Sequence, residues 1–558
     1  MSVRLGLFGF GRGALRGYGG APSEASLSSP LQLDGVSLSL ADVAAVARDG
    51  HPVGLGDAAM SRMTASHEWV TRSADGLLVD ENGDSLAVYG VNTGYGSLAR
   101  VRIDPARIAE LSWNLVRSHA AGVGPEVPIE VVRAMMLLRA NALARGASGC
   151  NPELVVRLTE MLNLGVTPVV PARGSCGSSG DLAPLAHLAL VLFHGGDPEE
   201  RVGEAWFEGK RYSGPGAMAE AGLSQILPGP KDGLAILNGA QLTCAITALA
   251  VHDAEALIHD AEVACAMSFD ALHGVTRALH PEVHELRPFP GAIDCAADLR
   301  ALLAGSEWCD SEPGKVQDTY SLRCTPQVLG AVRDGVRYAS QQVRIEVNSV
   351  TDNPVILLGE DDPNKAYSAG LFHGEPVGFA ADHLKLSLCE LGSLSERRLY
   401  RLTTGTLSTL PPLLRQESGL GMALPQITAA ALVAENRQLA WPCSADSIPT
   451  CEDQEDHVAM STTAARRAAR VLENTRRVVA IEVLAATHAL ELRRAEHGNR
   501  VLGAGVASAH ALLQDTLNEQ GTGVPHEDLI LVEALLRDGR LRKAAAETAG
   551  ALRPVGVA

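Results

Sequence analysis

The longest uninterrupted stretch of this sequence runs from Thr450 to His497 without a single glycine or proline. Because these two residue types are the strongest breakers of regular structure, the stretch predicts a very long helix. A second stretch, Leu234–Leu272, is interrupted only by Gly239, and Phe379–Leu402 repeats leucine along one helical face. Helices of this length with apolar faces need partners to cover them, so the chain is constrained to a bundle of long helices.

The amino-acid composition supports the same fold class. Of the 558 residues, 46% are hydrophobic but only 4% are aromatic, so we expect a core built mostly from alanine, leucine and valine. Aromatic and β-branched strand residues are sparse, which favours packed helices over a β-sandwich. We therefore predict a mainly α-helical molecule with a flexible extension at residues 1–30, an N-terminal part at 31–225 and a long-helix part at 226–558.

Charge and cysteine content exclude several classes of partner. The formal net charge of −18 argues against nucleic acid and against anionic membrane surfaces. The ten cysteines form no Cys-x-x-Cys pair, which argues against a disulfide framework and a zinc site. His280 and His284 have the spacing of half a metal site but lack an evident third ligand. No stretch is long and apolar enough to span a membrane, so we expect a cytoplasmic protein without metal, membrane or nucleic-acid partners.

The segment Gly174–His187 reads Gly-Ser-Cys-Gly-Ser-Ser-Gly-Asp-Leu-Ala-Pro-Leu-Ala-His and admits two interpretations. In the first, it is a polar turn that caps the following apolar helix through Asp181 or a serine. In the second, the Gly180 nitrogen attacks the carbonyl carbon of Ser178. Loss of two waters then leaves a five-membered ring whose exocyclic methylidene comes from Ser179. Such a ring is an electrophile, which the ordinary side chains lack.

This segment resembles the signature of the ammonia-lyases and aminomutases that carry a 4-methylideneimidazole-5-one (MIO) group. The family usually has Ala-Ser-Gly where this chain has Ser178-Ser179-Gly180, and serine should be tolerated because the first side chain stays outside the new bonds. The resemblance begins near Leu31 and covers nearly the whole remaining chain. It implies the long-helix fold of the family, MIO as the cofactor without metal or nucleotide, and a homotetramer whose active sites each draw on three chains. A large monomer is the alternative.

Two further motifs match the family. The loop Tyr89–Gly96 supplies Tyr89, which the resemblance implies is the base for the substrate's β-proton while the ring activates the amine. Free tyrosine has a pKa of about 10, so nearby positive charge or donors must lower it. The motif Gln317–Gln327 supplies Tyr320, implied to donate to the ring or relay a proton, and Arg323, whose planar fork suits a carboxylate. Without the resemblance, Tyr89 would be a core or turn residue and Arg323 a surface ion pair.

Two asparagines match family residues that bind the ring and the substrate carboxylate. Asn238 lies in Leu-Asn-Gly-Ala-Gln, and Asn353 lies in Thr-Asp-Asn-Pro. Each also has a plain structural explanation. Asn238 could be a helix C-cap beside Gly239, and Asn353 could form a turn before Pro354.

The residues that select the substrate match the histidine enzymes of the family most closely. His119 follows serine, whereas phenylalanine enzymes typically have Phe-Leu and tyrosine enzymes His-Leu. Glu455 stands where those enzymes tend to carry glutamine, and Gln317 and Phe372 also match the histidine pattern. An acid and an imidazole suit a polar substrate ring, because an unpaired polar group in a closed pocket is costly. The resemblance therefore implies conversion of L-histidine to urocanate; the alternative is a solvated Glu455 and a packed His119.

Several departures from the histidine pattern keep other activities open. Glu417–Gln426 is about two residues shorter than in histidine enzymes, Trp441 replaces a small residue or an imidazole, and Tyr95 replaces phenylalanine. An aminomutase that returns the amine to the β-carbon, or a tyrosine or phenylalanine ammonia-lyase, would share every motif above. A non-catalytic helical scaffold is a remote alternative, and the intact Ser179 and Tyr89 argue against it.

Overall fold

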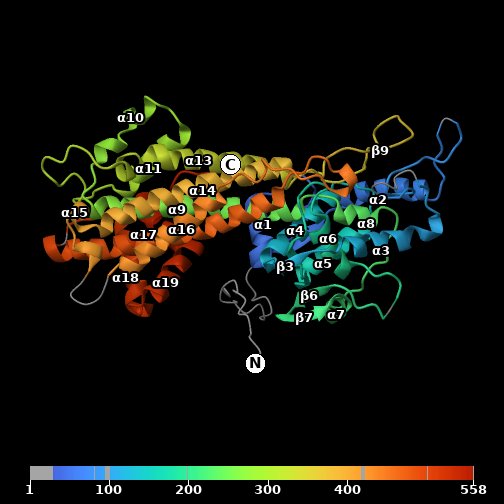
Figure 1. Ribbon diagram of the computed structural model, residues 1–558, viewed down its shortest axis with the longest axis horizontal. Coiled ribbons are helices and arrows are strands. Elements are labelled where there is room, and N and C mark those ends of the chain that lie inside the picture. The colour runs from blue at the N-terminus through green and yellow to red at the C-terminus, as the bar shows by residue number, and fades with distance from the viewer. Residues whose placement is uncertain are drawn as a thin grey trace.

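The computed structural model describes residues 29–80, 82–94, 101–197, 199–415, 421–498 and 500–556. Long helices run along the long axis of the molecule and fill one region, and shorter helices with small sheets form a second region beyond their end (Figure 1). Almost all of the extension predicted at residues 1–30 lies outside the described residues, as do Tyr95 and residues 416–420. Within the described residues, no helix combines the length and apolar character that crossing a membrane requires.

The prediction of a long-helix bundle is confirmed. Its main members are α17 (Ser461–His497), α9 (Gln241–Ala271) and α14 (Glu375–Thr403), with 37, 31 and 29 residues. Helix α17 packs against both α14 and α9. Most residues on its buried side are alanine, valine or leucine, whose small or regular side chains let neighbouring helices approach closely.

Helix α17 starts later than the sequence predicts. The stretch without glycine or proline begins at Thr450, but the helix begins at Ser461. In between, Cys451, Glu452 and Asp453 have φ angles of 49°, 56° and 63°, and Met460 has 50°. Left-handed backbone at residues other than glycine interrupts a right-handed helix, and composition gives no signal for it.

Most elements that follow α9 in the chain surround these three helices, whereas two short strands, Val355–Ile356 and Ala366–Tyr367, lie in the second region (Figure 1). Apart from α14 and α17, the elements after α9 are η4 (Thr276–Leu279), α10 (Pro281–Glu285), α11 (Pro290–Leu302), α12 (Tyr320–Arg323), α13 (Thr325–Glu346), β8 (Val355–Ile356), β9 (Ala366–Tyr367), α15 (Gly405–Ser408), η5 (Pro412–Leu414), α16 (Ala423–Leu439), η6 (Cys451–Asp453), α18 (Ala504–Gln520), α19 (Pro525–Arg537) and α20 (Arg540–Ala549). Strands β8 and β9 pair antiparallel.

The second region is organised around a helix that is buried on all sides. Helix α4 (Ile129–Ala144) is apolar nearly all round, as its sequence predicts, and Gly146 follows it with a φ of 80°. Its two buried arginines bind backbone carbonyls: Arg133 donates to Val46 and Leu162 at 2.8 and 3.0 Å. These bonds satisfy a buried charge and tie α4 to its neighbours.

The other elements of this region are short. They are β1 (Leu31–Leu33), α1 (Leu40–Ala44), η1 (Ala45–Asp49), β2 (Val53–Leu55), α2 (Asp57–Ala74), η3 (Pro105–Arg107), α3 (Ile108–His119), β3 (Val123–Glu126), α5 (Pro152–Leu164), β4 (Thr167–Pro168), β5 (Pro171–Arg173), α6 (Leu182–Leu192), β6 (Glu204–Phe207), β7 (Lys210–Ser213), α7 (Gly214–Glu220) and α8 (Asp232–Leu237). Strands β1 and β2 pair in parallel, β3 pairs antiparallel with β5, and β4, β6 and β7 form an antiparallel sheet.

Candidate active site

The segment Gly174–His187 is anchored by the side chain of Asp181, which is fully buried. Its carboxylate accepts hydrogen bonds from Ser175 Oγ at 2.6 Å, Thr462 Oγ1 at 2.7 Å and the backbone N–H of Thr243 at 2.8 Å. Burial raises the pKa of this carboxyl group, and the hydrogen bonds oppose that shift. Asp181 occupies the N-cap position of α6, but its side chain makes no capping bond there. It ties the segment to α9 and α17 instead.

The backbone of this segment is bent where ring formation would need it. Gly177 and Gly180 have φ angles of 74° and 77°, a conformation that glycine adopts without strain. A Cβ atom at position 180 would lie 2.4 Å from the nitrogen of Gly239, so no other residue fits there. The N–H of Asp181 donates to the Gly239 carbonyl at 2.8 Å, which fixes this close approach. The residues present therefore form a tight Ser-Ser-Gly turn, and they fit an MIO group built from Ser178, Ser179 and Gly180.

Asn238 lies beside this turn, where it has the C-cap role that its sequence allows. It is the C-cap residue of α8, and its Nδ2 donates to the carbonyl of Asn353 at 3.1 Å. Arg139 on α4 donates to the Asn238 carbonyl at 2.8 Å. Asn353 in turn accepts a bond from the backbone of Ala369 at 2.8 Å. The two asparagines predicted from the sequence therefore contact each other beside Gly239.

Beneath these asparagines lies a buried ion pair that the sequence analysis did not identify. Lys231 Nζ lies 2.9 Å from Asp352 Oδ2, and both side chains are fully buried. Lys231 also donates to the carbonyl of Ser148 at 3.1 Å. Breaking such a pair would leave an uncompensated buried charge, so it holds the loop that carries Asn353 firmly. A charged residue next to an apolar run, as at Lys231, is the only signal that the sequence offers.

Glu455 reaches the serine that would become the methylidene. Ser179 Oγ donates to Glu455 Oε1 at 3.1 Å, across 276 residues of sequence. The second carboxylate oxygen of Glu455 is buried and has no hydrogen-bond partner in the described part of the chain. Phe372 lies two residues before Gly374, whose N–H donates to the Gly177 carbonyl at 2.9 Å. Glu455 and Phe372, two of the four residues predicted to select the substrate, are therefore carried by loops that contact Gly174–His187.

Tyr89 and His119 belong to the same region as this segment. Tyr89 is half-buried in the connection between α2 and α3. The turn that carries it is pinned by buried Asn92, whose side chain donates to Leu86 at 2.8 Å and accepts from Val88 at 2.8 Å. His119 is the last residue of α3, which packs against α6 and α8. Its Nδ1 lies 2.8 Å from the carbonyl of Leu115.

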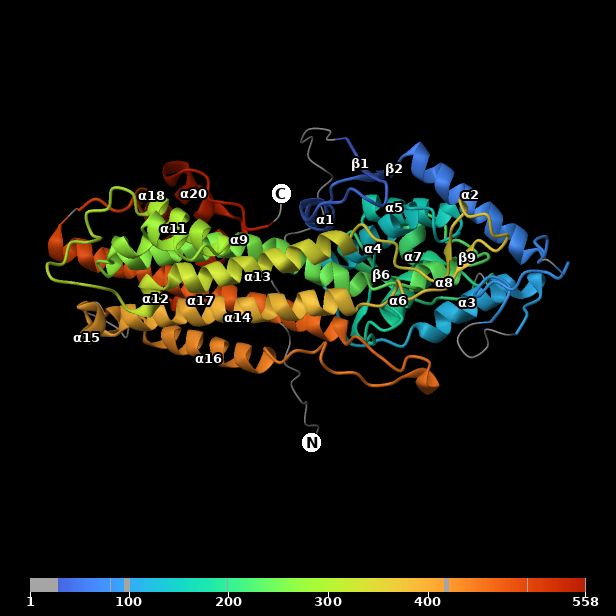
Figure 2. The same cartoon turned by 90° about the horizontal axis from the view of Figure 1, so that it is seen from above.

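The third group of predicted residues lies elsewhere. Tyr320 and Arg323 form α12, which follows Gln317 closely, at the end of the bundle opposite to α6 and α8 (Figure 2). The guanidinium of Arg323 lies 4.7 Å from the centre of the Tyr320 ring, and its Nε donates to the Asp318 carbonyl at 2.8 Å. Tyr320 is 69% exposed. One chain therefore does not bring these three residues to Ser179.

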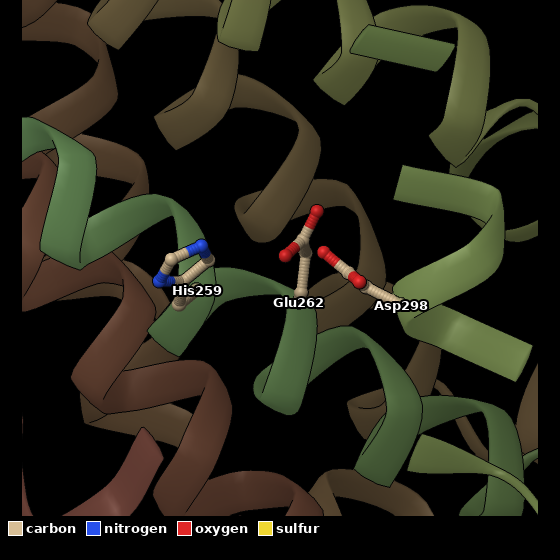
Figure 3. A group of neighbouring side chains, drawn as sticks. All are labelled: His259, Glu262 and Asp298. Carbon is tan, nitrogen blue, oxygen red and sulfur yellow. The ribbon is translucent and has the colours of Figure 1, made fainter. Parts of the chain in front are cut away.

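One cluster has the residue types of a metal site. Ligand atoms of His259, Glu262 and Asp298 lie within 4.8 Å of one another in the bundle (Figure 3). However, Nη1 of Arg333 donates to Glu262 at 2.5 Å and to Asp298 at 3.0 Å, so a guanidinium already supplies the positive charge. The ring of His259 lies 2.9 Å from the carbonyl of Arg553. We interpret the cluster as a buried ion-pair network that holds the C-terminal segment.

Comparison with known proteins identifies the family. The family model "Aromatic amino acid lyase" matches residues 38–515. A histidine ammonia-lyase from Gloeobacter violaceus is 44% identical over 531 residues, which cover 94% of this chain and 99% of that protein. The crystal structure of histidine ammonia-lyase from Trypanosoma cruzi is similar with a TM-score of 0.83 and 35% identity, covering 93% of this chain and 95% of that one. Tyrosine aminomutase from Streptomyces globisporus has a TM-score of 0.84 and 33% identity, covering 94% and 100%. The chain belongs to the aromatic amino acid lyase family.

Proposed function

We propose that this protein is a histidine ammonia-lyase, which eliminates ammonia from L-histidine to give urocanate. The observation that carries the proposal is the position of Glu455, whose carboxylate lies 3.1 Å from Ser179 Oγ and has one buried oxygen without a partner in the described residues. Formation of the ring removes the Ser179 hydroxyl as water and with it one hydrogen bond to Glu455, so the carboxylate can receive a polar substrate ring. The names of the relatives at 42–44% identity support the same substrate.

The side chains divide the work of the elimination between them. When formed from Ser178, Ser179 and Gly180, the MIO group supplies the electrophile that lets the amine depart. Tyr89 removes the β-proton through its side-chain oxygen, so that the C–H and C–N bonds break and a C=C bond forms. Asn238 lies against the Gly180–Gly239 contact, from where its amide can orient the amino acid.

Seven further residues bind the substrate or surround it in this scheme. Arg323 binds its carboxylate through two parallel hydrogen bonds. Glu455 pairs with the imidazole, and His119 and Phe372 line the same end of the pocket. Tyr320 moves a proton at its hydroxyl, and Gln317 and Asn353 complete the polar wall.

Arg323 and Ser179 lie at opposite ends of the bundle, so an active site that uses both residues draws on more than one chain. We therefore propose a homotetramer in which α12 of one subunit reaches the ring-forming segment of another. Large apolar side chains on the outside of α13, α14 and α16 support such contacts; they include Ile345, Phe379, Leu386, Leu424 and Ile427, each 48–64% exposed. All ten cysteines are free, which supports a reducing compartment such as the cytoplasm.

A direct assay tests the proposed activity. Purified protein is offered L-histidine, L-phenylalanine and L-tyrosine separately, and free ammonia and the conjugated acid are both measured. We expect L-histidine to be the preferred substrate and urocanate and ammonia to appear in equal amounts. Preference for phenylalanine or tyrosine would contradict the roles given to His119 and Glu455.

An aminomutase is the second candidate, because the structure of a tyrosine aminomutase matches this chain as well as that of a histidine ammonia-lyase does. A lyase and a mutase break the same bonds and differ in whether the amine returns to the β-carbon. The same assay separates them. Consumption of an amino acid without ammonia release, together with a β-amino acid product, would identify a mutase.

A further inference from the structure

Two loops carry the residues that contact the ring-forming segment from the bundle side. One loop leads into α14 and contains Phe372, followed by Gly374, which donates to Gly177 at 2.9 Å. The other leads into α17 and contains Glu455, which accepts from Ser179 at 3.1 Å. The specificity of the site therefore depends on how these two loops are held relative to each other.

The loop that carries Glu455 has a costly backbone conformation. Cys451, Glu452 and Asp453 are consecutive residues with positive φ, and none of them is glycine. Such conformations persist only where surrounding contacts impose them. The backbone bond from Thr450 N to Glu455 O at 3.1 Å closes the loop, and Val458 N donates to Ser447 Oγ at 2.8 Å. These bonds fix the ends of the loop but do not connect it to the loop of Phe372.

A pair of stacked imidazoles makes that connection. The rings of His373 and His457 are parallel within 8°, with their centres 6.0 Å apart. Nε2 of His373 lies 3.3 Å from the carbonyl of His457, and its Nδ1 accepts from the N–H of Glu375 at 3.4 Å. This arrangement assigns the proton to Nε2 and leaves Nδ1 as the acceptor. His373 follows Phe372 directly, and His457 lies two residues after Glu455.

Glu375, the first residue of α14, lies close to the two stacked imidazoles. Burial raises the pKa of the Glu375 carboxyl, while the two imidazoles oppose that shift, so Glu375 faces both rings. Its Oε2 is buried and has no hydrogen-bond partner among the described residues. The stack therefore lies between a partly buried acid and the loop that presents Glu455.

We propose that His373 and His457 are positioning residues, which hold the Glu455 carboxylate over the ring-forming serine and thereby set the affinity of the site for an imidazole ring. This inference rests on the proposed function, in which Glu455 pairs with the substrate's imidazole. Neither histidine is required to touch the substrate: both act through Glu455. The stack joins the two loops next to Phe372 and Glu455, and a second tie lies further along both connections, where Ser444 donates to Asp382 of α14.

Two inhibitors distinguish a loss of Glu455 positioning from a general disruption of the active site. Free imidazole probes the part of the pocket that contains Glu455, whereas glycine probes only the contacts to amine and carboxylate. In His457→Ala we expect the inhibition constant of imidazole and the KM for L-histidine to rise about fivefold to tenfold, the usual size of an aromatic pair. Glycine inhibition should change less than twofold. His457→Phe, which restores a ring, should recover most of the affinity for imidazole.

A double variant tests whether the stack acts through Glu455. In a Glu455→Gln background, His457→Ala should weaken imidazole inhibition less than twofold further, because the group that it positions is already gone. His373→Ala, on the opposite loop, repeats the test if His457→Ala fails to fold. His383→Ala is the matched control, because it also removes a ring contact, 4.9 Å from Tyr338, but lies within the bundle helix α14. It should leave both inhibition constants unchanged.

The outcomes distinguish this inference from the proposed function. The positioning role would be overturned if His457→Ala weakened inhibition by imidazole and by glycine equally. It would also be overturned if His457→Ala had its full effect on imidazole inhibition in the Glu455→Gln background. Neither result would contradict turnover of L-histidine by the wild type. If the wild type releases no ammonia from L-histidine although its intact mass shows the loss of two waters, the proposed function fails and this inference fails with it.

Discussion

The two ends of the long-helix bundle differ in how completely they are built. At the serine end, comprising Gly177–Asp181, Asn238, Asn353 and Glu455, side chains from distant parts of one chain converge and are tied by buried hydrogen bonds. At the arginine end, which comprises Gln317, Tyr320 and Arg323, Gln317 and Tyr320 are exposed and the half-buried Arg323 stacks over the Tyr320 ring. Each end holds residues that the other lacks for the elimination.

Under the proposed function, this difference divides the active site between the two ends of one chain. The serine end would supply the electrophile, the amide groups and an acid, whereas Arg323, which the sequence motif predicts to bind the substrate carboxylate, lies at the arginine end. The two ends lie far apart along the axis of the bundle (Figure 2), so we propose that a second copy of the chain completes each site.

The largest expected effect is at the serine end. Ser179→Ala removes the only source of the methylidene carbon, so we expect normal folding but loss of nearly all ammonia release. Intact-mass measurement checks the cause: the wild type should be two waters lighter than its sequence, and the variant should not be. A wild-type mass equal to that of the unmodified chain would contradict ring formation.

Tyr89→Phe should give the next largest effect. The variant keeps the ring and the packing of the loop but loses the base, and a positioned base is worth about 10²–10⁴-fold in rate. The rate of urocanate formation, measured at saturating L-histidine, is the test. If half of the activity remained, the base would have to be sought at Tyr320, at the other end of the bundle.

Arg323→Lys tests the arginine end with a smaller effect. Lysine keeps the charge but loses the planar fork, so we expect kcat/KM to fall about 10- to 100-fold, mainly through weaker substrate capture. Intact mass should show that the ring still forms. Kinetics identical to those of the wild type would mean that the substrate carboxylate binds elsewhere.

The smallest effect concerns stability at the serine end. Burial, with the negative charge of Asp181 adding to it, raises the pKa of Glu346 to about 7. The folded protein then keeps a proton that the unfolded chain releases near pH 4.5, so the free energy of unfolding falls as pH rises between these values. In Glu346→Gln, the fall in apparent Tm between pH 5 and pH 7 should therefore be smaller than in the wild type by about 1–3 °C. An unchanged slope in thermal unfolding would contradict it.

At the serine end, the sequence predicted the helices and the turn, but it did not predict the long-range bonds that hold them in place. Long runs without glycine or proline identified the main helices, and the Ser178-Ser179-Gly180 motif located the turn. What the sequence could not show is that Asp181 binds residues 62 and 281 positions away, because such contacts are set by packing. The same limit applies to the Lys231–Asp352 pair.

The start of α17 illustrates a different limit. Helix propensity and the lack of breakers both extend the predicted helix to Thr450, yet the loop that carries Glu455 uses left-handed backbone at ordinary residues. Tertiary contacts impose that conformation against local preference, and they serve the site: they turn Glu455 toward Ser179.

Subunit mixing tests most directly the claim that the two ends meet across chains. Ser179→Ala and Arg323→Ala chains, each inactive alone, are unfolded together and refolded. Because a site needs Ser179 from one subunit and Arg323 from another, random assembly should restore about one quarter of wild-type activity. A mixture of Ser179→Ala and Asn238→Ala, whose altered residues lie at the same end, should stay inactive. The shared site would be contradicted if the first mixture formed mixed tetramers but recovered no activity. It would also be contradicted if light scattering showed only a 58.5 kDa monomer in the wild type.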